Sequence, residues 1–169
     1  MNFAVISDTH SNWQNTQKAI NVIKEKKIKI ILHCGDIEGP EFLDKIDSIL
    51  ENIKMLAVLG NVDEGKFSDN DLIKARFKNI ELEKEIFRTK IGDKKIAFCH
   101  FPDIAKNLAE TQKYDFVFHG HTHKPWIESI GKTILLCPGN VAGIFYQPTL
   151  TIFKQEKFEL IKIKLTNDL

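Results

Sequence analysis

Short apolar runs that end just before residues of metal-ligating types constrain this chain more than any other feature. Runs of this kind are typical of buried strands in an α/β sheet. The runs are Phe3–Ile6, Ile28–Leu32, Met55–Leu59, Ile96–Phe98 and Phe116–Phe118. The polar residues that follow them are Asp8, His10, Asp36, Asn61, His100, His121 and His123. Because ligands bind beyond the carboxyl ends of the strands in open α/β sheets, these side chains are predicted to meet in one crevice and form a metal site.

Length and charge narrow the class of protein. The 169 residues suit a single domain, and one domain spanning residues 1–169 is expected. The 24 basic and 23 acidic side chains leave a net charge of +1, which argues against nucleic-acid or membrane-surface partners. Apolar runs are too short to span a membrane, and the N-terminus turns polar too early for a signal peptide. A cytoplasmic location is expected.

The cysteines agree with a reducing compartment. Cys34, Cys99 and Cys137 are odd in number, far apart, and not arranged as Cys-x-x-Cys. Each follows an apolar run, which favours a buried small hydrophobic residue. A thiolate in the metal shell is the weaker alternative, because the oxygen-rich and imidazole-rich set is complete without one.

The first half of the chain predicts alternating strands and helices. Strands are expected at Phe3–Ile6, Ile28–His33 and Met55–Leu59. One helix is expected from about Asn15 to Lys26, and a second begins at Gly39-Pro40. A parallel order with helical crossovers is the simplest topology, and it places the loops after the strands on one edge of the sheet.

The second half predicts hairpins instead. The expected strand pairs are Ile86–Ile91 with Lys95–Cys99, Trp126–Ile130 with Thr133–Leu136, and Leu150–Lys154 with Phe158–Leu165. A helix between Ile104 and Thr111 and a strand at Phe116–His119 interrupt them. Asp63–Phe77 is the least patterned stretch, expected to be a loop or a short helix near the site. The expected architecture is α/β, with two sheets face to face and helices outside.

Most of the polar signals have a structural explanation when taken singly. Asp8 and Asp36 could cap helices or turns, and Gly60-Asn61 could be a turn. Gly120-His121-Thr122-His123 is harder to explain as packing, because a buried histidine needs partners for both ring nitrogens. The mixed donor set admits Mn, Fe, Ni, Zn or Mg. Seven ligands are too many for one tetrahedral ion and suit two ions with a bridging carboxylate, for which Asp36 is the candidate.

With these motifs in this order, the chain resembles the calcineurin-like metallophosphoesterases, and among them the small bacterial and archaeal phosphodiesterases. The residues that carry the resemblance are Asp8-Thr9-His10, Gly35-Asp36, Gly60-Asn61-Val62-Asp63, His100, Gly120-His121-Thr122-His123 and Pro138-Gly139. It extends over almost the whole chain. The resemblance implies a four-layer α-β-β-α sandwich of two mixed sheets flanked by helices. It also implies two divalent ions, manganese above all, one held by Asp8, His10, Asp36 and His123 and the other by Asp36, Asn61, His100 and His121.

The implied activity is hydrolysis of a phosphoester, most of all a small-molecule phosphodiester. Asp36, Asn61 and His100 are then catalytic, and Asn12, Asn61 and His100 contact the substrate. Two ions roughly 3.5–4 Å apart can hold a bridging hydroxide in line with the scissile P–O bond. Larger members often carry a His directly after Gly-Asn, where this chain has Val62, so the acid that would protonate the leaving oxygen is missing. Small members also lack it, and they often self-associate, which makes a homo-oligomer a further expectation.

A non-catalytic scaffold is the alternative from a different functional class. A eukaryotic relative in the retromer coat uses this small fold as a protein-interaction module. Such modules can lose a metal-binding His, whereas all seven positions are present here. A nuclease is a weaker alternative, disfavoured by the neutral charge.

Residues beside the motifs carry smaller predictions. Phe101 follows His100 where the family frequently has Gly, and it is expected to narrow the pocket. His33 and His119 are expected to orient ligands or to pack in the core. Trp13 is expected either to stack on a substrate ring or to pack in the core, and Asn140 to brace a turn.

Overall fold

The computed structural model describes residues 2–72 and 76–164, and residues 1, 73–75 and 165–169 lie outside the described part. The α-helices are α1 (Trp13–Glu25), α2 (Pro40–Leu50) and α3 (Pro102–Glu110), and two short 3₁₀ helices span Asn61–Asp63 and Asp69–Leu72. The strands are β1 (Phe3–Ile6), β2 (Ile30–His33), β3 (Lys54–Val58), β4 (Ile80–Glu83), β5 (Ile86–Ile91), β6 (Lys94–Cys99), β7 (Phe116–Phe118), β8 (Trp126–Ile130), β9 (Thr133–Cys137), β10 (Thr149–Lys154) and β11 (Lys157–Lys162).

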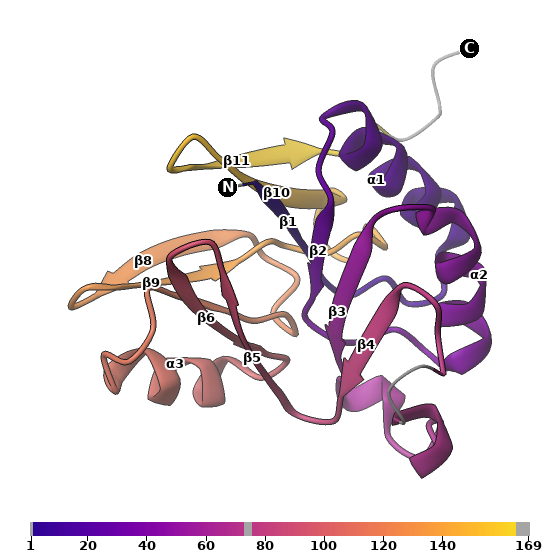
Figure 1. The fold of residues 1–169 in the computed structure, drawn as a ribbon, viewed down its shortest axis with the longest axis horizontal. Helices are drawn as coiled ribbons and strands as arrows, with labels where there is room; N and C mark the ends of the chain where they lie inside the picture. Colours follow the sequence, from indigo (N-terminus) through magenta and orange to yellow (C-terminus); the bar gives the residue numbers. More distant parts are fainter. Residues whose placement is uncertain (1, 73–75, 165–169) are drawn as a thin grey trace.

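The strands form two mixed sheets with helices on their outer faces. The first sheet has the order β11-β10-β1-β2-β3-β4, and the second has the order β5-β6-β7-β9-β8. Figure 1 shows α1 and α2 outside the first sheet and α3 outside the second. The expected four-layer α/β architecture is therefore confirmed.

Alternation along the strands explains the layers. In β1, Ala4 and Ile6 pack toward α1 and α2, whereas Phe3 points into the core between the two sheets. In β6, Phe98 faces that same inter-sheet core, and Ala97 packs toward α3. Successive side chains of a strand point to opposite faces, so strands that are covered on both faces read as continuous apolar runs.

Parallel pairing places the candidate residues at one edge of each sheet. Strands β1, β2, β3 and β4 pair in parallel, as do β6, β7 and β9. The loops that follow β1, β2, β3, β6 and β7 carry the polar residues singled out above. The carboxyl ends of these strands therefore meet, as the parallel order predicts.

The predicted helices and strands differ from the observed ones mainly at their ends. Strand β2 begins at Ile30, because Ile28 still belongs to the turn after α1, where its N–H donates to the Ile23 carbonyl oxygen. Strand β11 ends at Lys162, and the predicted end of this strand, Leu165, lies outside the described residues. Strand β4 was not predicted: its four residues extend the first sheet beside β3, with Ile80 and Leu82 buried.

No helix among the described residues has both the length and the hydropathy needed to cross a membrane.

Candidate metal centre

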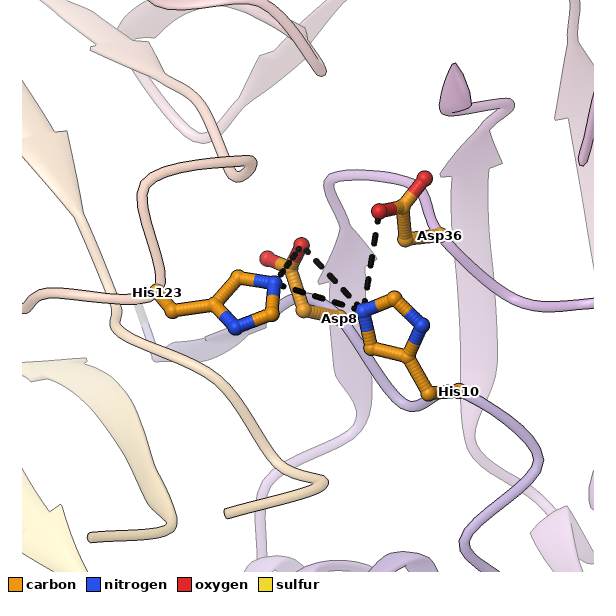
Figure 2. A group of neighbouring side chains, drawn as sticks. All are labelled: Asp8, His10, Asp36 and His123. Atoms are coloured by element: carbon orange, nitrogen blue, oxygen red, sulfur yellow. Dashed lines mark hydrogen bonds and ion pairs between the residues drawn. The ribbon is translucent and has the colours of Figure 1, made fainter. Parts of the chain in front are cut away.

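Four predicted ligands form a compact group at the ends of β1, β2 and β7. Ligand atoms of Asp8, His10, Asp36 and His123 all lie within 4.8 Å of one another, so this group could hold a metal ion. Figure 2 shows the side chains converging from three loops. His10 Nε2 lies 3.3 Å from His123 Nε2 and 3.6 Å from Asp36 Oδ2, and His123 Nε2 lies 3.2 Å from Asp8 Oδ1.

The remaining predicted ligands form a second group on the other side of Asp36. Asn61 Oδ1 lies 2.9 Å from both His100 Nε2 and His121 Nδ1. The two imidazole nitrogens are 3.3 Å apart, and His100 Nε2 is also 3.3 Å from Asp36 Oδ1. Asp36 therefore directs one carboxylate oxygen to each group, which is the arrangement expected of a bridging ligand.

The hydrogen bonds of His100 and His123 to backbone carbonyls indicate which ring nitrogen of each can bind a metal ion. His100 Nδ1 lies 2.8 Å from the carbonyl oxygen of Cys34, and His123 Nδ1 lies 3.3 Å from that of Ile144. A carbonyl only accepts, so each Nδ1 carries a proton, and each ring in its neutral form presents an Nε2 lone pair to the site. Those lone pairs face other acceptors, namely Asp8 Oδ1, Asp36 Oδ1 and Asn61 Oδ1. Converging acceptors repel one another unless a cation lies between them, so the donor set fits divalent ions.

The charges in the site also favour a bound cation. Asp8 is fully buried, and its Oδ2 has no hydrogen-bond partner among the described residues. Burial alone would raise the pKa of Asp36, but the hydrogen bond and charge of His100, together with the Val62 N–H, lower it below its usual value. Burial would lower the pKa of His100, but Asp36, Asp8 and the Cys34 carbonyl together raise it above its usual value, and the hydrogen bond to Asp8 raises the pKa of His123. The site thus favours added positive charge, supplied by a proton or by a metal ion.

The backbone of the site is unusual as well. Among the seven predicted ligands, five adopt a left-handed backbone, namely Asp8 (φ 54°), His10 (42°), Asp36 (59°), His121 (68°) and His123 (58°). A positive φ is uncommon outside glycine and costs free energy that the surrounding structure must supply. Such conformations concentrate at functional sites, because the strained backbone aims a side chain that regular structure would point elsewhere.

Comparison with known proteins assigns the chain to a family. Residues 1–157 match the calcineurin-like phosphoesterase superfamily domain. The chain belongs to the calcineurin-like phosphoesterase superfamily. It is 28% identical to the phosphodiesterase MJ0936 of Methanocaldococcus jannaschii, in an alignment that covers 98% of this chain and 99% of that relative.

Solved structures of other proteins have the same fold. An archaeal phosphodiesterase superposes with a TM-score of 0.81 at 23% identity, covering 96% of this chain and 99% of the other. Vps29 of Entamoeba histolytica, in complex with Zn²⁺, superposes with a TM-score of 0.63 at 17% identity, covering 97% of this chain and 100% of the other. At these identities both neighbours support the fold.

The glycines within the superfamily motifs are required because a side chain at these positions would collide with a neighbouring loop. A Cβ on Gly60 would collide with Oδ1 and the backbone N of Asp36, and one on Gly35 would lie 2.8 Å from His100 Nδ1. A Cβ on Gly120 would collide with Ser7 Oγ and approach Asp8 Oδ2 to 2.8 Å. The glycines of the Gly-Asp, Gly-Asn and Gly-His motifs thus let the ligand loops pack against one another.

Asp63 connects two of these loops, a role the sequence reasoning missed although it quoted the residue in a motif. Its Oδ1 accepts hydrogen bonds from the N–H groups of Ile37 (3.0 Å) and Glu38 (2.6 Å), and its Oδ2 accepts one from Gly60 N (2.8 Å). The side chain is buried, and burial raises its pKa against these hydrogen bonds. Asp63 therefore fixes the loop of Asp36 relative to the loop of Asn61. The spacing of Gly60 and Asp63 was the available sequence signal, since a carboxylate three positions after a residue can accept a hydrogen bond from the N–H of that residue.

His33 and His119 are buried behind the predicted ligands, where an orienting or core role was expected. Gly35 N donates to His33 Nδ1 (3.2 Å), so His33 Nε2 carries the proton and donates to Thr9 Oγ1 (3.1 Å). Thr9 Oγ1 in turn lies 3.4 Å from the carbonyl oxygen of Asp36, so His33 supports the backbone of both ligand loops. The His119 ring packs beside Trp126, and its Nδ1 lies 2.9 Å from the Gly120 carbonyl oxygen.

Other residues near the site have mainly structural contacts. Asn12 Oδ1 accepts from Asn15 N and so caps α1, and Asn12 Nδ2 donates to the Ala142 carbonyl. These two hydrogen bonds leave the second N–H of the Asn12 amide available, and the predicted substrate contact stays a prediction. Trp13 packs edge-on against Phe42 beside the core. Asn140 is buried and braces its turn, since its Oδ1 accepts from Gly143 N and Ile144 N.

The cysteines are buried and unpaired. Burial raises the pKa of Cys99 to about 12 and that of Cys137 to about 11. These side chains therefore remain thiols, and they serve as small hydrophobic residues.

Proposed function

We propose that the protein is a metal-dependent phosphodiesterase that uses two divalent ions, manganese first among them, for in-line attack of water on phosphorus. The observation that carries the proposal is the convergence of lone pairs on both sides of Asp36, with its two oxygens directed to different groups. The family and the phosphodiesterase relative support the reaction class. When bound, such a pair of ions activates a water molecule for attack and neutralises the phosphate oxygens.

The proposed roles follow from position. Asp8, His10 and His123 would hold one ion, and Asn61, His100 and His121 the other, with Asp36 shared between them. Asn61 is exposed and directs its Oδ1 toward the imidazoles, which leaves its amide nitrogen able to donate to a phosphate oxygen. His100 is held by the Cys34 carbonyl at the same side of the site. We therefore propose that Asn61 and His100 contact the phosphate as well as the ion.

The proposal is tested by hydrolysis of bis-p-nitrophenyl phosphate. The protein is stripped with a chelator, and Mn²⁺, Ni²⁺, Zn²⁺ or Mg²⁺ is then added back. Hydrolysis should disappear on chelation and return with metal, and Asp36→Asn should remain inactive because its amide cannot supply two anionic oxygens. Asp44→Asn is the matched control, since Asp44 lies on α2 and pairs with Arg76. Activity without metal, or full activity of Asp36→Asn, contradicts the proposal.

A protein-interaction scaffold is the second candidate function, and the likeness to Vps29 is the observation behind it. Metal binding alone does not distinguish the two functions, because that Vps29 structure also contains Zn²⁺. The presence of all seven predicted ligand residues favours the enzyme. Metal-loaded protein that hydrolyses no phosphodiester would favour the scaffold.

A further inference from the structure

A cavity of about 580 Å³ opens beside the second group of ligands. Its lining includes Asn61 and His100 themselves, together with the 3₁₀ segments that follow β3 and the turn between β4 and β5. A phosphate held at Asn61 and His100 would therefore place one of its ester groups at the mouth of this cavity. A cavity of about 630 Å³ near Lys54 and Ile80 lies at the amino-terminal ends of β3 and β4, away from the ligands.

Two phenylalanines line the cavity: Phe67 packs against the core, whereas Phe101 lies next to the predicted ligands. The Phe101 ring centroid lies 5.1 Å from that of His100 and 5.3 Å from that of His121, and the residue is 37% exposed. The backbone is fixed at the start of α3, where the Phe101 carbonyl accepts from Ala105 N at 3.1 Å. A partly exposed ring on a fixed backbone costs little entropy when another ring stacks on it.

Charge restricts what the cavity can accept. Glu64, Asp69 and Glu85 line it and are exposed, and Lys84 is the cation among the lining residues. An ester group bearing a carboxylate or a second phosphate would be repelled there. An uncharged group is not subject to this repulsion.

A second exposed aromatic residue flanks the opposite end of the site. Phe145 is 88% exposed, and its ring centroid lies 5.9 Å from that of His123. It lies outside the cavity lining, on the side of the other ligand group. Phe145 therefore provides a matched control for a ring at the wrong end of the site.

We propose that this cavity binds one ester group of the phosphodiester, and that it selects an uncharged aromatic ring by stacking on Phe101. This inference rests on the proposed function, since it places the phosphate at Asn61 and His100. Phe101 is then a specificity-determining residue. The sequence led us to expect that its side chain narrows the pocket, and in this proposal the same side chain contacts the ester group.

Calorimetric titration of the Mn²⁺-loaded protein with diphenyl phosphate and diethyl phosphate tests the proposal. Diphenyl phosphate should bind more tightly than diethyl phosphate to the wild-type protein. Phe101→Leu keeps an apolar side chain but removes the ring, so it should weaken diphenyl phosphate binding about tenfold and leave diethyl phosphate binding unchanged within about twofold. Phe101→Tyr should retain the preference, and Phe145→Leu should not alter it.

Several results would overturn the assignment. One is an unchanged affinity of Phe101→Leu for diphenyl phosphate, another is an equal loss for both diesters, and a third is loss of the preference in Phe145→Leu. Binding of bis(4-carboxyphenyl) phosphate as tight as that of diphenyl phosphate would overturn the charge selection. Release of phenol is measured in the same samples, so that the binding constants are separated from turnover. Failure of the wild-type protein to hydrolyse bis-p-nitrophenyl phosphate would instead contradict the proposed function.

Discussion

Val62 lies beside Asn61 at the position where larger members of the superfamily often carry a histidine. Its backbone N–H donates to Asp36 Oδ1 at 3.1 Å, so the residue helps to position the shared carboxylate. Its isopropyl group cannot donate a proton to a leaving oxygen. In the proposed reaction, the leaving group therefore departs with little protonation from the protein.

Turnover is accordingly expected to depend steeply on the basicity of the leaving group. Measured kcat for methyl aryl phosphates should fall as the pKa of the departing phenol rises, because charge accumulates on the phenolate oxygen in the transition state. Val62→His, which places an acid beside Asn61, should make the dependence shallower. A flat dependence in the wild-type protein would exclude this account of Val62.

His33 links the stability of the protein to pH. Burial lowers the pKa of His33 from 6.5 to about 4, so the folded protein keeps the ring neutral over a range in which the unfolded chain binds a proton. The neutral, buried ring of His33 makes its full contribution to the free energy of unfolding above pH 6.5. This contribution is lost progressively as the pH falls toward about 4. One pKa unit corresponds to about 1.4 kcal/mol, so the loss amounts to roughly 3 kcal/mol.

The prediction is checked by urea unfolding of the metal-free protein between pH 7 and pH 4, alongside His33→Gln. The glutamine variant lacks this titration, so its deficit in unfolding free energy relative to the wild-type protein should shrink as the pH falls. A deficit that stays constant across the range would mean that His33 does not titrate in this way.

At the scale of elements, the centre depends on how the loops after β2 and β3 are held together. Asp63 accepts hydrogen bonds from the backbone N–H groups of Ile37, Glu38 and Gly60, and it links these loops in addition to the hydrogen bond from Val62 N to Asp36. Asp63→Asn replaces one accepting oxygen by an N–H₂ group that would face an N–H donor. The loop carrying Asn61 should then shift relative to Asp36.

Asp63→Asn is therefore expected to weaken metal binding about 10–100-fold, which is typical of changes to groups that orient ligands. Calorimetric titration with Mn²⁺ measures this effect, and Asp44→Asn on α2 provides the matched control. Wild-type affinity in Asp63→Asn would show that the two loops hold their positions without this carboxylate.

Much of the element order is readable from the sequence, and the failures have physical causes. Phe3–Ile6 is apolar at every position because both faces of β1 are covered, so its strand is evident. Strand β4 was missed because its alternation of Ile80 and Leu82 with glutamates lasts for only four residues. The left-handed backbones of Asp8 and Asp36 could not be predicted either, because packing between loops imposes them. The order of the motifs was predictable. The local hydrogen bond from Gly60 to Asp63 had a sequence signal, whereas the bonds from Ile37 and Glu38 did not, because they join loops far apart in the sequence.

At the scale of the whole molecule, the centre joins the two sheets. Asp8, His10, Asp36 and Asn61 follow strands of the first sheet, whereas His100, His121 and His123 follow strands of the second. Each proposed ion would thus be bound by both sheets. A metal that binds only the folded protein stabilises it by mass action, by about 2.7 kcal/mol for one site at a hundredfold excess over Kd. Metal should therefore raise the Tm of the protein.

The most direct test of the account is the number and position of bound ions. Crystals of Mn²⁺-loaded protein, measured at the manganese absorption edge, should show two anomalous peaks per chain, one on each side of Asp36. The account predicts that Asp36→Asn loses at least one of these peaks. A single peak in the wild-type protein, or two peaks that do not share Asp36, would contradict the dinuclear centre.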